Sequence, residues 1–242
     1  AGVRSLAREA TPHRDAGVSR RDRLLLRRTA VDGIAAIGPN AYASVPQLLR
    51  CAKDPDTELQ RKSLIALGAM GSLATPAGIN QLVDTLRSGD APEVRDAAVE
   101  GLSTVGADAV PQLMAILDPD KEIDADDKAR AALALGKMGP IAKDALEVLD
   151  SALDDEDPWV RINAAEAIWR ISGQTTSPAS ALVLELESPD RQVRIRAVRL
   201  FTTLGPRAKS AEPALKRLLT HKRGRVRRAA TMALRAIQRP NR

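Results

Sequence analysis

The stretch Glu93-Val94-Arg95-Asp96-Ala97-Ala98-Val99-Glu100-Gly101-Leu102 carries a frame that the rest of the chain repeats. The frame has a Val followed by an Arg, an Ala four residues after the Val, and a large apolar residue eight after it. We take the Val position as the anchor of each unit, and the anchors are Leu26, Leu59, Val94, Asp127, Val160, Val193 and Val226. They are 33, 35, 33, 33, 33 and 33 residues apart. This period indicates stacked supersecondary units, none of which can bury its apolar face alone.

Each unit predicts a pair of antiparallel helices, as residues 140–172 illustrate. Gly139-Pro140 marks the end of one helix and the start of the next, since Pro suits a first helical turn and Gly a helix end. Apolar residues at helical spacing run over 141–153 and, after an acidic break, over 160–171. No segment alternates polar and apolar residues with a period of two. The sequence therefore predicts an all-α protein.

The frame Asp-x-x-Val-Arg-x-x-Ala-x-x-Ala-Leu-x-x-Ile-Gly resembles HEAT-like repeats of the phycobilisome-lyase type over about residues 20–238. The resemblance implies a right-handed α-solenoid of about six to seven HEAT-like helical hairpins, with the second helix of each on the concave side. We expect residues 19–238 to form this solenoid, residues 1–18 an N-terminal arm or partial first repeat, and residues 239–242 a basic tail. Such repeats serve many unrelated roles, so the resemblance predicts architecture rather than function.

The net charge of +6 averages over an acidic middle and two basic ends. Residues 72–172 hold 9 basic and 20 acidic side chains, a net of −11. Residues 206–242 hold 12 basic and 1 acidic, a net of +11, and residues 1–38 hold 8 and 4, a net of +4. This asymmetry bears on partners and association rates rather than on the fold.

The sequence contains no recognisable catalytic pattern. It lacks a nucleophile elbow and a phosphate-binding Gly loop, and no His lies near Cys51 in sequence. His13 and His221 lie near opposite ends, which argues against a histidine metal site. We therefore expect a non-enzymatic protein with no catalytic, cofactor-binding or metal-binding residues.

The compartment stays open. No apolar run approaches the roughly 20 residues needed to span a bilayer, so no transmembrane segment is expected. The chain starts at Ala1 without a Met, and we expect either a soluble cytoplasmic protein of bacterial type or one exported after removal of a signal peptide.

Two columns of charge accompany the anchors. The position after the anchor is mostly basic, and the position three before it is mostly acidic. In HEAT-like families these columns form a ladder of charge-assisted hydrogen bonds between neighbouring repeats. The resemblance implies that structural ladder here, in Asp56, Arg95, Asp124, Lys128, Asp157, Arg161, Asp190 and Arg194.

A second pattern lies two, six and nine residues after each anchor, on the predicted second helices. It combines apolar and charged side chains, which is typical of a helix- or peptide-binding groove. We expect Trp169 to anchor a partner, because Trp dominates interface hot spots. The alternative is that half of these side chains pack between adjacent second helices. The groove candidates are Ile65, Leu133, Ile162, Glu166, Trp169, Ile195 and Arg199.

The C-terminal basic run is a third candidate site. Its members Arg223, Arg225, Arg228 and Arg235 could bind nucleic-acid phosphate, an anionic membrane surface or an acidic protein neighbour. No aromatic residue follows Phe201, which argues against reading of stacked bases. The alternative is a polar cap that keeps the last repeat soluble.

These patterns favour a protein-binding scaffold or assembly subunit that uses the groove and the charged ends. Protein partners are therefore expected, or a place in a larger complex. Two alternatives remain: a tetrapyrrole (bilin) lyase subunit, which the repeat type resembles, and a nucleic-acid-binding protein that acts through its basic C-terminal end.

Overall fold

The structure is a computed structural model that describes residues 19–239, and every secondary-structure element within that range is helical. The prediction of an all-α solenoid is confirmed. The predicted N-terminal arm and the last three residues of the basic tail lie outside the described residues. The chain divides into two units, Ala1–Leu113 and Met114–Arg242, called unit 1 and unit 2 below, and each is described by itself.

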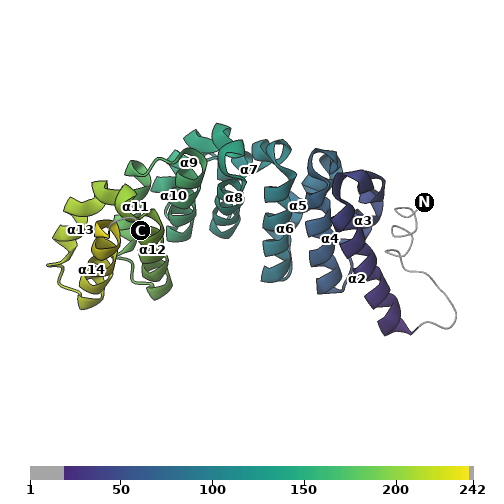
Figure 1. Ribbon diagram of the computed structural model, residues 1–242, viewed down its shortest axis with the longest axis horizontal. Helices are drawn as coiled ribbons and strands as arrows, with labels where there is room; N and C mark the ends of the chain where they lie inside the picture. Colours follow the sequence, from purple (N-terminus) through teal and green to yellow (C-terminus); the bar gives the residue numbers. More distant parts are fainter. Residues whose placement is uncertain (1–18, 240–242) are drawn as a thin grey trace. The chain divides into compact units, whose positions relative to one another are not determined.

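Within the described residues, unit 1 contains α2 and two complete hairpins, α3–α4 and α5–α6. Their bounds are α2 Arg20–Ile37, α3 Val45–Cys51, α4 Thr57–Ala69, α5 Thr75–Ser88 and α6 Pro92–Val105, with 3-10 turns at Gly38–Ser44 and Gly71–Leu73. The second helices pack in the order α2, α4, α6, while α3 lies against α4 and α5 against α6 (Figure 1). A short 3-10 turn, Ala107–Ala109, precedes α7, Val110–Leu117, which spans the division between the units.

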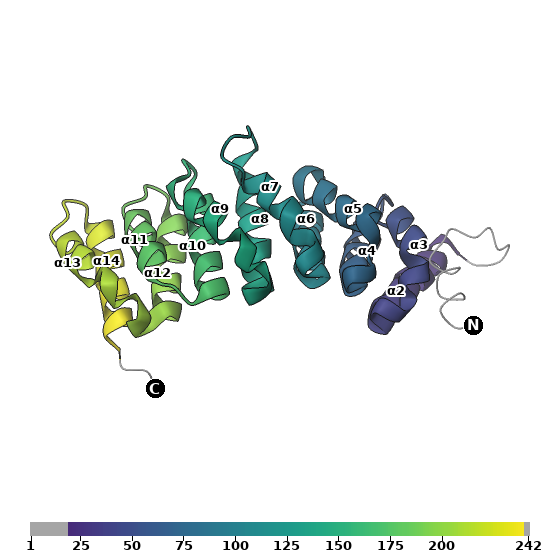
Figure 2. The ribbon, with the colours of Figure 1, turned by 90° about the horizontal axis from the view of Figure 1, so that it is seen from above.

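Unit 2 contains α8 and three complete hairpins, α9–α10, α11–α12 and α13–α14 (Figure 2). The bounds are α8 Ala125–Met138, α9 Leu146–Ser151, α10 Pro158–Ser172, α11 Thr176–Glu185, α12 Arg191–Leu204, α13 Glu212–Leu218 and α14 Gly224–Gln238. Three 3-10 segments, Gly139–Ala145, Ala152–Asp154 and Gly205–Ala211, complete it. Here α8, α10, α12 and α14 are the second helices, and each packs on the next. We call the side that they form the second-helix face of unit 2.

The first helix predicted over 141–153 is not continuous. The chain winds as a 3-10 segment up to Ala145, with non-helical backbone at Ala142, before α9 begins. Ala142 and Ala145 are both fully buried, and the tight 3-10 winding brings residues three apart onto one side. The same device recurs 66 residues later, where Ala208 has the non-helical backbone and is buried with Ala211. The helical periodicity of the sequence alone does not distinguish a 3-10 segment from an α-helix at these positions.

The predicted ladder has the wrong partners, beginning with its acidic column. The side chains of Asp56, Asp124, Asp157 and Asp190 cap the second helices α4, α8, α10 and α12 by accepting backbone N–H groups. In α10, for example, Asp157 accepts from the amides of Trp159 and Val160 at 2.7 and 3.2 Å. A helix start leaves such donors unsatisfied, so these carboxylates cap their own helices. Asp56 also binds Arg28 of the preceding repeat.

The arginines of the basic column donate hydrogen bonds to the loops of their own hairpins. Arg161 donates from Nη1 to the backbone oxygens of Asp155 and Glu156, the two residues five and six positions before it, at 2.7 and 2.8 Å. Arg194 and Arg227 repeat this geometry on the corresponding loop carbonyls. The arginine after the anchor therefore holds the turn between the two helices of its own hairpin. Arg95 occupies the same position in α6, where it is half-buried.

Apart from the Arg28–Asp56 pair, the bonds between neighbouring repeats use acids that the ladder did not include. Their partners lie near the ends of the following first helices. The pairs are Arg27–Asp54 at 2.7 Å, Lys128–Asp155 at 3.0 Å and Arg161–Glu185 at 2.6 Å. The basic column thus joins repeats through different carboxylates from the predicted ones.

Asp56 illustrates how such a contact makes stability depend on pH. Arg28 donates to its two carboxylate oxygens at 2.9 and 2.5 Å, and this bond is the main reason why the pKa of Asp56 lies below its ordinary value of 3.8. The Leu59 amide, at 2.8 Å, lowers the pKa further, while burial opposes both. A depressed pKa in the folded state stabilises the fold above the unfolded pKa, and that contribution is lost as pH falls through the folded pKa.

We expect Asp56→Asn to cost about 1 kcal/mol at neutral pH, because Asn keeps the helix cap but loses the charge that pairs with Arg28. The difference in free energy of unfolding between wild type and variant should shrink below about pH 4. Urea denaturation of both proteins at a series of pH values measures it. A difference that stays constant into the acid range would contradict the assignment.

Candidate functional site

Small residues bring some second helices into close contact. A Cβ atom added to Gly68 of α4 would lie 2.5 Å from the Cα of Gly101 in α6. One added to Gly136 of α8 would lie 3.0 Å from the Cα of Ala167 in α10. Both pairs have the same register. The first residue of each pair lies nine residues after the anchor of its own repeat, and the second lies seven residues after the anchor of the next repeat. Between α8 and α10 this approach leaves a cavity of only about 10 Å³.

The same register places larger side chains along the rest of unit 2. Trp169 of α10 pairs in register with Leu200 of α12, and Thr202 of α12 pairs with Ala233 of α14. Larger side chains at these positions keep neighbouring backbones further apart than a Gly–Ala pair does. An open groove of about 480 Å³ lies between α12 and α14.

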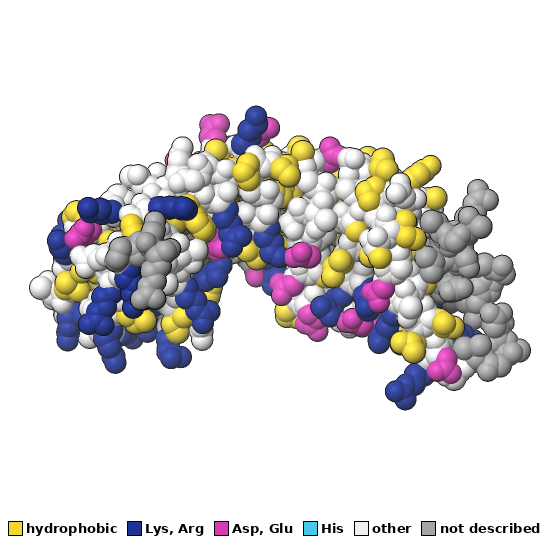
Figure 3. All heavy atoms as spheres, in the orientation of Figure 1, with side chains coloured by type: hydrophobic (Ala, Val, Ile, Leu, Met, Phe, Trp, Pro, Cys, Tyr) yellow, Lys and Arg dark blue, Asp and Glu magenta, His cyan; other side chains and the backbone are white. Residues whose placement is uncertain are grey.

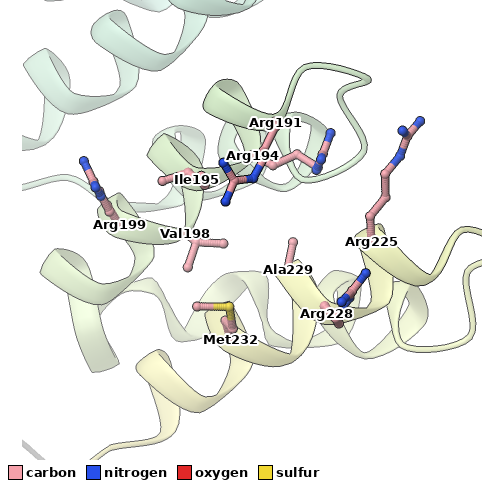
Figure 4. Close-up of a pocket in the computed structure, with 9 residues that line it drawn as sticks. All are labelled: Arg191, Arg194, Ile195, Val198, Arg199, Arg225, Arg228, Ala229 and Met232. Carbon is pink, nitrogen blue, oxygen red and sulfur yellow. The ribbon is translucent and has the colours of Figure 1, made fainter.

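We call this feature the α12–α14 groove and define it by its nine lining residues. They are Arg191, Arg194, Ile195, Val198, Arg199, Arg225, Arg228, Ala229 and Met232 (Figure 4). The close-up places Arg199 toward one end and Arg225 toward the other, with the apolar side chains between them. The groove therefore joins an apolar floor to an arginine rim.

The floor is accessible to a partner. Val198 and Ala229 are buried and Ile195 is half-buried, whereas Met232 is 59% exposed. A methionine side chain is flexible and polarisable, which suits a surface that adapts to bound apolar groups. Met232 is therefore placed to contact a partner and is not part of the core.

The rim carries positive charge that the fold does not neutralise. Among residues 19–239, no carboxylate lies within ion-pair distance of Arg191, Arg199, Arg225 or Arg228. The space-filling view shows Lys and Arg side chains gathered over the α12 and α14 end of unit 2 (Figure 3). The pKa of Arg194 is lowered from its ordinary value, first by burial and then by the charge of Arg225, against a smaller opposing effect of Asp190. An anion in the groove would offset this repulsion.

Two sets of sequence candidates meet in the groove. Ile195 and Arg199 come from the predicted apolar strip, and Arg225 and Arg228 come from the predicted basic end. The two remaining basic candidates do not line it. Arg223 stands exposed at the N-terminus of α14, and the exposed Arg235 lies near the C-terminal end of that helix.

The other groove candidates lie elsewhere on the second helices. Ile65 is 39% exposed on α4 in unit 1, Trp169 is half-buried on α10, and Leu133 lines the closed α8–α10 junction. Ile162 is fully buried, so its predicted place on an open groove is wrong. The side chain belongs to the buried core of unit 2.

Glu166 is also wrongly assigned to a groove rim. It is only 8% exposed and binds Arg170 of its own helix at 2.7 Å. It also binds Arg196 of α12, so the carboxylate joins α10 to α12. A buried carboxylate with two guanidinium partners is a structural contact and is not available to a ligand.

Sequence reasoning missed Arg191, Val198 and Ala229 as groove residues, and it assigned Arg194 to the ladder. Met232, six residues after its anchor, lies on the predicted strip but was not among the groove candidates. That reasoning followed positions two, six and nine after each anchor on single helices. A space between two helices also uses positions that flank these, such as Val198, five residues after its anchor. One sequence signal could have located the groove: the sizes of the residues that face each other between adjacent repeats.

The described residues contain no group of three or more His, Cys, Asp or Glu side chains placed to hold a metal ion. Cys51 is buried in α3, and burial raises the pKa of its thiol above the ordinary 9.0, although the nearby Arg27 opposes the shift. A buried thiol that resists ionisation is poorly suited to nucleophilic chemistry. None of the helices described is both long and apolar enough to cross a bilayer.

Comparison with known families accounts for the repeated hairpins. A profile described as HEAT repeats matches residues 19–103, 110–185 and 179–241, which together cover most of the chain. The chain belongs to the HEAT repeat family. A second profile, PBS lyase HEAT-like repeat, matches residues 94–119 of this HEAT repeat protein.

Two solved structures are similar to this HEAT repeat protein, and the one with a TM-score above 0.5 supports its fold. The protein is similar to the designed armadillo repeat protein YIII(Dq)4CqI, with a TM-score of 0.41 and 16% identity, covering 97% of this chain and 99% of that one. It is also similar to the karyopherin Kap121p bound to the extreme C-terminus of the protein phosphatase Cdc14p, with a TM-score of 0.51 and 16% identity, covering 97% of this chain and 29% of that one. At such identity the likeness shows the solenoid fold alone. No curated protein sequence matches the chain.

Proposed function

We propose that this HEAT repeat protein is a non-enzymatic protein-binding scaffold or assembly subunit that takes a partner on the second-helix face of unit 2. One observation carries the proposal. The α12–α14 groove combines an accessible apolar floor with arginines whose charges the fold leaves unpaired. Apolar surface removed from water supplies binding energy at roughly 25 cal/mol per Å², and charged groups at the rim add specificity and a faster approach.

The shape of the site also supports a protein partner. A channel between two helices of one face suits a helix or an extended segment, which recognises such a groove through a few anchoring side chains. Kap121p is described as bound to the extreme C-terminus of another protein, so a similar solenoid takes a peptide segment. That binding belongs to Kap121p, and it supports the proposal here only by likeness of fold.

Nucleic acid is the second candidate, because the unpaired arginines would bind any polyanion. Its weakness is the floor of the groove. None of the nine lining residues is aromatic, so unpaired bases would find no ring to stack on. The tetrapyrrole lyase alternative rests on the repeat type matched at residues 94–119, and no feature of the α12–α14 groove adds to it.

The proposal predicts that apolar contact in the groove is required for capture of a partner. Three proteins are compared after nuclease treatment: wild type, Ile195→Asp/Met232→Asp, and the control Leu184→Asp. Leu184 lies on α11 outside the groove and is 61% exposed, close to the 59% of Met232. Affinity capture from the native source with quantitative mass spectrometry provides the readout.

We expect specific proteins to be captured by wild type and by the control and to be lost from the groove variant. Circular dichroism should show unchanged helicity in all three. The same proteins captured by all three would contradict binding at this face. Capture dominated by nucleic acid before nuclease treatment, with no protein remaining after it, would favour the second candidate.

A further inference from the structure

We infer that the α12–α14 groove recognises an acidic amphipathic protein segment, with an apolar side chain on the floor and Asp or Glu carboxylates on the arginine rim. The inference rests on the proposed scaffold function and names the chemistry of its partner. Two observations point to this occupant: the charge of the rim and the composition of the floor.

Within residues 19–239 no carboxylate forms an ion pair with the rim arginines, although the charge of Asp190 acts on Arg194. Residues 206–242 hold 12 basic side chains and one acidic one, Glu212. That carboxylate already accepts from Lys216 at 3.0 Å and from Gln238 at 3.1 Å. Guanidinium groups bind carboxylates through paired, charge-assisted hydrogen bonds, so acids on a partner are the fitting complement to five arginines.

Arg194 further favours the binding of an anion in the groove. Its Nη1 is held by the backbone oxygens of Ser188 and Pro189 at 2.7 and 2.8 Å, so the guanidinium cannot swing away from the groove without losing both bonds. Burial and the charge of Arg225 both disfavour its ionised form. A carboxylate at the rim would relieve this cost, and it would meet a guanidinium that is already positioned.

The floor separates a protein segment from other anions. The groove has a volume of about 480 Å³, and its floor is formed by the apolar side chains of Ile195, Val198, Ala229 and Met232. A chain of phosphates would bind the arginine rim through its charged oxygens, but it has no apolar group that could pack against the floor. A Leu or Met side chain flanked by acids satisfies both parts of the groove at once.

The test uses a fluorescent 16-residue peptide that is helical and amphipathic, with Leu on one face and Glu on the other, and the full chain at low and moderate salt. Fluorescence anisotropy gives Kd. Two control peptides change one property each, with Glu replaced by Gln or Leu replaced by Ser. We expect either replacement to raise Kd about tenfold or more, because each removes one of the two parts of recognition.

Variants of the protein then locate the site. Arg225→Glu/Arg228→Glu should raise Kd about tenfold or more, and Arg225→Lys/Arg228→Lys should raise it less, because Lys keeps the charge but not the paired geometry. The control is Arg207→Glu/Lys209→Glu, which changes net charge equally at two exposed positions outside the groove. We expect it to leave Kd within about twofold of wild type at moderate salt.

Three results would overturn the inference. One is equal weakening by the control and by the groove variant, which would mean that overall charge governs binding. Another is equal affinity for the Leu-to-Ser peptide. The third is an unlabelled single-stranded oligonucleotide that displaces the acidic peptide at lower concentration than the unlabelled peptide does, which would assign the groove to nucleic acid.

The capture experiment with natural partners distinguishes a failure of this inference from a failure of the proposed function. If Ile195→Asp/Met232→Asp loses the partner while Arg225→Glu/Arg228→Glu keeps it, the scaffold function stands and the acidic segment is wrong. If neither variant loses it, the groove is not the binding surface and both proposals fail.

Discussion

Arg161→Met is expected to lower the free energy of unfolding by about 3–5 kcal/mol, the cost of leaving a buried charge without its partner. Arg161 donates from Nε to Glu185 at 2.6 Å, and Glu185 is only 1% exposed. No other ion pair to Glu185 is found within residues 19–239. Met has a similar length but no charge, so the carboxylate of Glu185 would stay buried while losing its counterion.

Two other arginines provide the matched control. Arg194 and Arg227 hold their own loop carbonyls as Arg161 does, but neither binds a buried carboxylate. We expect Arg194→Met and Arg227→Met to cost about 1–2 kcal/mol each, the scale of lost charged hydrogen bonds. Urea denaturation followed by circular dichroism compares the three variants, and equal losses would show that the Glu185 contact adds nothing.

The double variant Arg161→Met/Glu185→Leu tests whether the unpaired carboxylate of Glu185 causes the loss of stability. Removing both charges takes away the uncompensated carboxylate, so part of the lost stability should return. A double variant that is less stable than Arg161→Met would mean that Glu185 has a stabilising role independent of Arg161.

Gly101→Ala is the second large effect, with an expected loss of about 1–3 kcal/mol from overpacking. The new Cβ would lie 2.7 Å from the backbone oxygen of Leu64 in α4 and 2.7 Å from Cδ2 of Leu82 in α5. Because the backbone oxygen cannot move aside alone, α4 and α6 must separate. In an open helix the same change would stabilise by about 1 kcal/mol, so the sign itself is informative.

Gly78→Ala is the control for Gly101→Ala. Gly78 also lies within a helix, α5, but a Cβ there would meet its nearest neighbours at 3.5 and 3.6 Å, which is ordinary contact. We expect it to be neutral or stabilising by up to about 1 kcal/mol. Thermal and urea denaturation measure both variants. Equal effects on stability would rule out close helix contact as the role of Gly101.

Local patterns predicted much of the fold because they act within one helix or one loop. The 33-residue period and the apolar stripes predicted the paired helices, and the acidic break before residue 160 coincides with the start of α10, which Asp157 caps. The resemblance-based ladder failed for the same physical reason. A carboxylate beside unsatisfied amides bonds locally first, and Asp157 therefore caps α10 instead of reaching a neighbouring repeat.

The groove could not be located in this way. Ile162 and Ile195 occupy the same position after their anchors, yet one is fully buried and the other lines the α12–α14 groove. What separates them is the packing of their helices on the neighbours. The α8–α10 junction, where Gly136 approaches Ala167, leaves a cavity of only about 10 Å³, whereas the α12–α14 groove has about 480 Å³.

The sequence by itself determined the repeat period, the all-α hairpins and the distribution of charge, because each depends on residues close together in the chain. Only the tertiary structure decided which second helices separate and which arginines meet there. Helix spacing depends on the combined size of side chains from two repeats, and Arg199 and Arg225 share a rim only after α12 and α14 have packed.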